Sequence, residues 1–152
     1  MTQEDNYTKG LKKLLEMGRE DTMLNQRQIS EDMYQLSVGT LFGEIWNRPH
    51  LSLRDRQLIT LAANIALARP HGTHSHYRSA HHIGITHEEI CEIMIHVGMY
   101  GGWPCIAHAT SQYLEVLEER GDPMAKSNPK RDEIREESVS YTHLTLPTTP
   151  YV

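Results

Sequence analysis

The sequence predicts an all-α protein, a compact helical bundle built as a single domain. Apolar side chains recur at every third or fourth position in several segments that glycine or proline separates, a spacing typical of amphipathic helices. Two of these segments begin with a capping-box pattern, in which Ser or Thr precedes an acidic residue by three positions. No segment shows the sustained polar–apolar alternation or the Asn-Gly turn of a β-hairpin. Short breaks between helices favour antiparallel neighbours, and therefore a bundle.

Two helices are expected near the N-terminus. Residues 7–17 carry leucines at helical spacing, with Gly10 inside the helix. Residues 33–46 form the next helix, which stops before Pro49 because the residue preceding a proline is pushed out of the α region. This second helix presents two adjacent stripes that together predict a broad buried face. One stripe holds Met33, Leu36, Ser37, Thr40 and Glu44, and the other holds Tyr34, Val38, Leu41 and Ile45.

A long helix and a short helix are expected next. Ser52 and Asp55 form the first capping box, and Pro70 closes the helix that begins there. Thr73 is expected to cap the short helix, and Gly84 is expected to end it, since glycine suits the position that follows a helix.

The last two core helices flank a pair of glycines. Thr86 and Glu89 form the second capping box and open the first of these helices. Residues 101–102 are both glycine and break the chain, and Pro104 opens the final helix, which runs to Leu117.

Composition excludes several classes of partner. Lys and Arg number 15 against 20 Asp and Glu, a net charge of −5 without a basic block, so neither nucleic acid nor an anionic membrane is an expected partner. No apolar run is long enough to span a membrane, and residues 1–13 are too polar for a signal peptide, which favours a cytoplasmic protein. Cys91 and Cys105 lie too far apart for a CxxC motif and are too few for a secreted disulfide framework. Apolar residues on two faces of the same helices predict a homo-oligomer.

The ends of the chain differ from its body. Residues 1–127 are expected to form the domain, and residues 128–137 are dense in charge and resemble a linker. Residues 138–152 contain no Lys, Arg, Asp or Glu, and the stretch VSYTHL within them resembles a translated sequencing adapter. This tail is therefore interpreted as non-native and excluded from the fold prediction.

Three blocks of sequence carry a family resemblance. They are FGEIWNRPHLSLRDRQLITLA from Phe42, His76 followed eight residues later by Gly84, and YGGWP ending at Pro104. Over residues 34–118 the chain resembles the carboxymuconolactone decarboxylase family. The resemblance implies the all-helical alkyl hydroperoxidase D-like fold and assembly into a homotrimer or homohexamer. It also implies one of two activities, a cofactor-free decarboxylation or a thiol-dependent peroxidase reaction.

The cysteine pattern favours the decarboxylase branch. Peroxidase members of the family carry a CxxC whose second cysteine lies four residues before the active-site histidine. Arg69 and Gly72 stand at those two positions in this sequence. The thiol mechanism needs a low-pKa thiolate with a resolving cysteine beside it, and the chain offers neither at this place.

The resemblance therefore predicts a cofactor-independent decarboxylase of a small carboxylated lactone, similar to 4-carboxymuconolactone, in aromatic catabolism by the β-ketoadipate pathway. As such a lactone loses carbon dioxide, electrons move through the ring double bond into the carbonyl, so the substrate supplies its own electron sink and no cofactor is expected. Two alternatives stay open. One is a CxxC-less family member with lactone hydrolase, isomerase or residual peroxidase activity. The other is a non-catalytic helical oligomer that binds a small acid or a metal.

Three residues are the candidate catalytic groups. His76 shares a helix face with Ala80, so it should point inward, and the peroxidase members place their active-site histidine there; it is expected to deliver a proton to carbon. Glu44 lies on an apolar stripe, which suits a carboxyl group of raised pKa. Arg56 can grip a carboxylate through its fixed fork of donors. The structural alternatives are a hydrogen-bonded core histidine, a boundary carboxylate and a surface ion pair.

Five further residues are candidates for binding the substrate, because they lie in or beside the family blocks or near the core face of a helix: Arg48, Arg69, His96, Tyr100 and Trp103. The histidines at 71, 74 and 76 raise the question of a metal site. Residues two apart on a helix face away from each other, however, so no native metal site is predicted.

Overall fold

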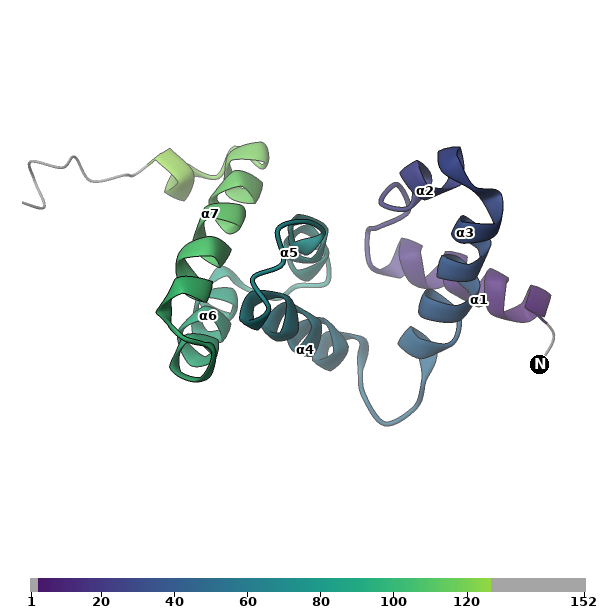
Figure 1. Cartoon of the computed structure of the whole chain (residues 1–152), viewed down its shortest axis with the longest axis horizontal. Coiled ribbons are helices and arrows are strands. Elements are labelled where there is room, and N and C mark those ends of the chain that lie inside the picture. Colours follow the sequence, from purple (N-terminus) through teal and green to yellow (C-terminus); the bar gives the residue numbers. More distant parts are fainter. Residues whose placement is uncertain (1–2, 127–152) are drawn as a thin grey trace, which may run out of the picture. The chain divides into compact units, whose positions relative to one another are not determined.

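The computed structural model describes residues 3–126, and the predicted linker 128–137 and tail 138–152 lie outside that range. The elements within it are all helices, which confirms the all-α prediction (Figure 1). They are α1 (Gln3–Glu16), α2 (Leu24–Ile29), α3 (Glu31–Leu36), the π-helix η1 (Ser37–Phe42), the 3₁₀ helix η2 (Ile45–Asn47), α4 (Leu53–Ala66), α5 (Thr73–His82), α6 (His87–Gly101), α7 (Trp103–Glu119) and the 3₁₀ helix η3 (Pro123–Lys126). None of these helices is long and apolar enough to cross a membrane.

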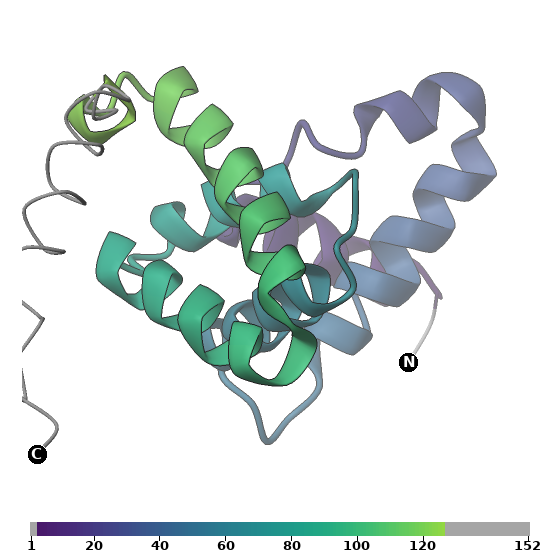
Figure 2. The same cartoon turned by 60° about the vertical axis from the view of Figure 1, so that its left-hand side comes forward.

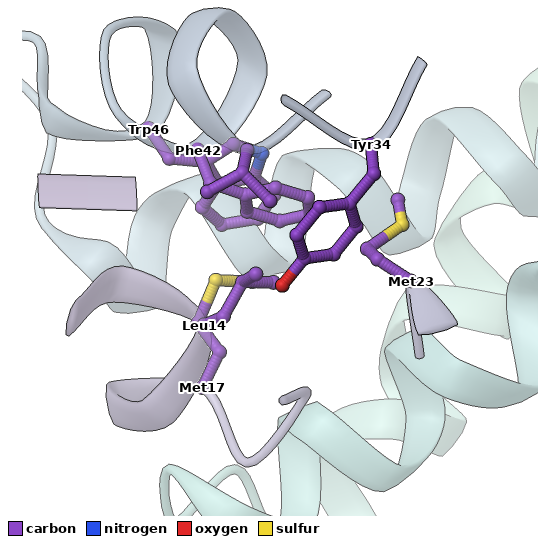
Figure 3. Packing of buried hydrophobic residues seen from close by; sticks show 7 residues of the cluster. Leu14, Met17, Met23, Tyr34, Phe42 and Trp46 are labelled. Atoms are coloured by element: carbon purple, nitrogen blue, oxygen red, sulfur yellow. The ribbon is translucent and has the colours of Figure 1, made fainter. Parts of the chain in front are cut away.

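The chain divides into two compact units, of which the first is Met1–Val116. Its N-terminal part is held by a hydrophobic cluster where α1 packs on η1 (Figure 3). The buried members of this cluster are Leu14, Met17, Met23, Tyr34, Val38, Phe42 and Trp46. Gly10 allows this contact, because a Cβ at that position would lie 2.0 Å from the carbonyl oxygen of Val38.

The segment predicted as one helix over 33–46 differs from expectation. It is divided into α3, η1 and η2, and η1 has π-helical hydrogen bonding. Tyr34 and Val38 of one predicted stripe are buried, whereas Leu41 and Ile45 of the same stripe are each 42% exposed. Met33 and Leu36 on the other stripe are 46% and 60% exposed, so the predicted broad buried face is wrong at these positions.

The helices that follow begin and end largely as predicted. Both capping boxes are present, with Ser52 accepting from the Asp55 backbone N–H and Thr86 accepting from that of Glu89. Thr73 is the first residue of α5 rather than its cap, because the chain enters α5 from Gly72 in a left-handed conformation with φ of 89°. The hydroxyl of Thr73 donates instead to the carbonyl of Arg69, 3.3 Å away.

α4 contacts both α5 and α6 (Figure 2), and a second group of buried residues belongs to these helices and to the turn that joins α5 to α6. It includes Leu61, Ile65, Tyr77, Ala80, Ile85 and Ile90. These contacts fix α4 against α5, and two hollows border α4, with Ile59 lining both of them.

Candidate active site

A hollow of about 350 Å³ lies where α4, α5 and the N-terminal elements meet. Its volume lies within the range of sites for small ligands. Its lining consists of Arg19, Met23, Leu41, Phe42, Ile45, Trp46, Leu51, Arg56, Ile59, Thr60 and His76. This set contains two arginines, one histidine and no acidic residue, so the hollow favours an anion with an apolar body.

His76 projects into this hollow from the first turn of α5, the inward orientation that its shared helix face with Ala80 predicted. Its ring stacks at 15° to that of Trp46, with 6.4 Å between the centroids. On another side, the amide nitrogen of Gln57 donates to the His76 carbonyl at 2.7 Å and lies 3.4 Å from Nδ1 of the ring. The histidine is therefore held by both its backbone and its ring.

Arg19 lies in the turn after α1 and is the most unusual group of the hollow. It is only 6% exposed, and its guanidinium carbon lies 5.5 Å from the centroid of the Phe42 ring. Its Nη2 donates to the Ser75 hydroxyl at 2.9 Å, while Nη1 lies 3.2 Å from both ring nitrogens of His76. Burial lowers the pKa of Arg19 to about 10, so the side chain still carries its charge at neutral pH.

No acidic side chain pairs with Arg19 among the described residues, and its Nε is buried without a hydrogen bond there. A buried charge without a counter-ion is costly, and it is normally kept where a ligand supplies the opposite charge. The end of α1 aims the side chain: Gly18 has φ of 62°, and the Arg19 N–H donates to the carbonyl of Leu14 at 2.9 Å. Together these features place a fixed, desolvated cation at the hollow.

The protonation state of His76 follows from the same neighbours. Burial, and then the positive charge of Arg19, lower the pKa of His76 to about 3. The ring is therefore neutral across the physiological range in the free protein. A neutral imidazole is too weak an acid to supply a proton readily, so this state does not favour the predicted proton delivery by His76.

Arg56 lines the same hollow from the start of α4. Its Nη2 donates to the carbonyls of Arg48 and Pro49, at 2.6 and 3.4 Å, and its Nε is buried without a hydrogen bond among the described residues. The alternative of an ion pair with the adjacent Asp55 does not hold, because that carboxylate accepts from the Ser52 hydroxyl at 2.7 Å. Arg48 contributes its carbonyl to this arrangement while the residue itself is exposed.

Two other predicted residues lie outside the hollow. Glu44 is exposed and borders a separate polar hollow with Asn6, Lys9 and Asn47. Arg69 is exposed, and its carbonyl accepts hydrogen bonds from α7. Its described contacts are thus structural, and within one chain the structure brings neither side chain to His76.

His96 borders a different hollow, of about 450 Å³, which is lined by α4 and α6 and shares Ile59 with the hollow of His76. This second hollow is lined by Leu58, Ile59, Ala62, Glu89, Glu92, Ile93, His96 and Val97. His96 packs at a tilt on Tyr100, with 5.2 Å between the centroids. Tyr100 and Trp103 are 84% and 62% exposed, so these three predicted binding residues do not share a site with His76 in this chain.

Neither cysteine resembles a peroxidase thiol. Burial and the neighbouring Glu88 raise the pKa of Cys91, the reverse of what a reactive thiol needs. Cys105 is buried, and its thiol donates to the carbonyl of Gly102 at 2.9 Å. Among the described residues, no three His, Cys, Asp or Glu side chains are placed to hold a metal ion.

The sequence interpretation missed Arg19, Trp46 and Gln57 as site residues. Arg19 and His76 are 57 positions apart, and nothing local to Arg19 predicts that contact. Gln57 did leave a signal, because it lies at four-residue spacing before Leu61 and Ile65 on the buried stripe of α4. A glutamine on such a stripe needs a hydrogen-bonding partner inside the fold.

Comparison with known proteins identifies the family of the chain. A sequence model described as the carboxymuconolactone decarboxylase family matches residues 31–114, more than half of the 152 residues. The chain is 29% identical over 132 residues to a 4-carboxymuconolactone decarboxylase of Acinetobacter baylyi, covering 84% of this chain and 98% of that protein. It is 26% identical over 106 residues to the nitrosuccinic acid decarboxylase npaB of Metarhizium robertsii, covering 68% of this chain and 74% of that protein.

Proposed function

Because the chain belongs to the carboxymuconolactone decarboxylase family, we propose that it is a cofactor-independent decarboxylase of a small acid with an electron acceptor next to the departing carboxylate. Both relatives are named decarboxylases, which supports the reaction type in general. The observation that carries the proposal is Arg19, a buried cation without an acidic partner among the described residues, in contact with a neutral histidine.

The acids in the relatives' names share one chemical feature, an electron acceptor near the departing carboxylate. In carboxymuconolactone, the departing carboxylate lies on the saturated carbon next to the ring double bond, and that double bond is conjugated with the lactone carbonyl. In nitrosuccinate, it lies on the carbon that bears the nitro group. In both, the electron pair left by carbon dioxide passes into an acceptor within the substrate and onto an oxygen atom. The protein must then bind carboxylate and stabilise a new oxyanion.

The residues of the hollow suit these tasks. Arg19 offers a desolvated, permanent charge to one carboxylate, and Arg56 borders the same space as a second cation. Phe42 and Trp46 supply apolar walls, which strengthen electrostatic contacts by keeping water away. The carbon–carbon bond breaks to release carbon dioxide, and the resulting carbanion takes a proton from water.

The proposal also covers the substrate, the pathway, the assembly and the cellular location. A 4-carboxymuconolactone-like lactone is the preferred substrate, because the longer match is to the relative named for it. A role in aromatic catabolism follows from that substrate. Assembly into a homotrimer or homohexamer is supported by the exposed apolar residues of α6 and α7, such as Met99, Tyr100 and Trp103. Cytoplasmic location rests on the sequence alone.

The direct test is to incubate the purified protein separately with 4-carboxymuconolactone and with nitrosuccinate, and to measure carbon dioxide release and identify the products. We expect release above the spontaneous rate from at least one acid. It should be lost in Arg19→Met and kept in Arg54→Met, since Arg54 is exposed and paired with Glu89. A product that retains every carboxyl carbon would indicate a hydrolase or isomerase, and no conversion of either acid would contradict the proposal.

A further inference from the structure

Gln57 is fully buried in α4 and does not itself line the hollow, yet it reaches the ring of His76. Its amide orientation is fixed by the carbonyl of His76, 2.7 Å away, because only the nitrogen end of the amide can donate to that oxygen. The same nitrogen lies 3.4 Å from Nδ1, so its second N–H is available to that ring nitrogen. Gln57 therefore presents a donor, and not an acceptor, to Nδ1.

A ring nitrogen whose lone pair points at a donor must itself be an acceptor. Nη1 of Arg19 is equally distant from both ring nitrogens, at 3.2 Å, so it lies over the ring and not in line with either lone pair; Gln57 is then the donor that decides between them. Nδ1 is then unprotonated, and the single proton of the neutral imidazole lies on Nε2. Adding a proton at Nδ1 would set two donors against each other and would also place a positive ring 3.2 Å from Nη1 of Arg19. The charged groups that line the hollow are Arg19 and Arg56, and none of the lining residues is acidic. Both charged residues that line the hollow are cations, so both disfavour a protonated, positively charged His76 ring.

We propose that Gln57 is a positioning residue that holds His76 as the neutral Nε2–H tautomer, and that His76 donates this hydrogen bond to the oxyanion formed on decarboxylation. The inference rests on the proposed function and assigns His76 an electrophilic role in place of proton delivery. No proton leaves the ring in this step. The carbon–carbon bond breaks, its electron pair moves into the acceptor and onto oxygen, Nε2–H stabilises that oxygen, and water later protonates the carbon.

The tautomer can be observed directly in the full-length free protein labelled with ¹⁵N-histidine. The resonances of His76 are assigned by their loss in His76→Gln. We expect one protonated nitrogen, Nε2, and one unprotonated nitrogen, Nδ1, with no change between pH 5 and pH 8. A proton on Nδ1, or a titration of His76 within that range, would overturn the proposal.

Gln57→Glu tests whether the donor at Nδ1 matters. A carboxyl group of the same length presents an acceptor there, so Nδ1 should become protonated and His76 should titrate at a higher pH. We expect kcat to fall about 100-fold, the effect of losing one oxyanion donor, with a new limb in the pH–rate profile. KM should change little, because Gln57 does not border the hollow. A Gln57→Glu variant with the wild-type tautomer and wild-type kcat would overturn the assignment.

Gln112 offers a matched control for a purely structural role. It is also buried, and its amide nitrogen donates to the carbonyls of Arg69 and Pro70, remote from the His76 ring. Both Gln57→Met and Gln112→Met should lose stability, but only Gln57→Met should mix the His76 tautomers and lower kcat. If the two variants behave alike in NMR and in kcat, Gln57 is structural and the proposal fails.

The oxyanion contact is tested with the nitronate of 3-nitropropanoate, the carbanion left when nitrosuccinate loses carbon dioxide. Its binding should shift the Nε2–H proton of His76 without proton uptake, and an unshifted resonance in the saturated complex would overturn the donor role. The free-protein spectra do not depend on turnover. A protein that shows the Nε2–H tautomer but releases no carbon dioxide would therefore contradict the proposed function alone. An active decarboxylase whose His76 titrates near neutrality would contradict only the present inference.

Discussion

The two hollows beside α4 each contain a histidine that the sequence marked as a candidate, and they differ in almost every other respect. His76 lies beside two arginines in a hollow without an acidic lining residue. His96 is exposed and lies beside Glu89 and Glu92 in a larger, mostly apolar hollow. An anionic substrate would be attracted to the first and repelled by the second. Charge and burial therefore favour the hollow of His76 as the candidate site, whereas hollow size and histidine content do not distinguish it.

The largest expected effect distinguishes the two histidines. His76→Gln should lower kcat about 100- to 1,000-fold, because an oxyanion donor of this kind contributes that much. His96→Gln should leave kcat essentially unchanged. Steady-state kinetics on both variants, with melting temperatures to verify folding, make the comparison. Equal losses in the two variants would show that both hollows contribute to one site.

Replacing Arg19 tests whether its buried charge makes the hollow of His76 bind anions. Arg19→Gln should raise KM for an acidic substrate about 10- to 100-fold, the effect of losing one charged hydrogen bond. It should also raise the pKa of His76, since the charge of Arg19 is the second cause of its lowering. Glu92→Gln in the other hollow serves as the control and should leave KM unchanged. A wild-type KM in Arg19→Gln would show that the substrate carboxylate binds elsewhere.

The pH dependence of stability should also depend on His76. Its pKa is about 3 in the folded chain and 6.5 ordinarily, so between these values the unfolded chain binds the extra proton. The free energy of unfolding should therefore fall as the pH drops from 6.5 toward 3, by at most about 1.4 kcal/mol per pH unit from this group. Urea unfolding at pH 7 and pH 5 measures this slope. It should be shallower in His76→Gln than in His96→Gln, and equal slopes would place His76 in contact with solvent.

The smallest effect is expected for the two cysteines, which lie outside the hollow that Arg19 and Arg56 line. Changing Cys91 and Cys105 together to Ser should leave decarboxylation within a few-fold of wild type, since neither thiol lines the first hollow. The same double variant tests the peroxidase alternative. Consumption of an alkyl hydroperoxide that disappears in this variant would restore that alternative.

Local signals in the sequence were sufficient for part of the fold. The two capping boxes depend on residues three positions apart, so Ser52 and Thr86 could be identified without any tertiary information. The divided segment from α3 to η2 could not be predicted, because which of its residues are buried depends on where α1 packs. That misassignment also made Glu44 a candidate, although it lies outside the His76 hollow.

The sequence predicted only some of the residues of the candidate site. His76 and Arg56 came from the family blocks, and both border the hollow. Arg19 lies before the stretch that matches the family, and its role depends on a contact between distant parts of the chain. Local sequence patterns contain no information about such a contact. The missing part of the site was therefore the part that only tertiary packing creates.

Gly18 shows how function can depend on a residue without a ligand contact. A Cβ at this position would lie 2.6 Å from the ring of His82, and its φ of 62° is unfavourable for other residues. Any substitution would therefore disturb the turn that aims Arg19. A library that randomised only the residues around the hollow would never sample this position. Substrate preference could nonetheless change through it, so directed evolution of this enzyme should include the end of α1.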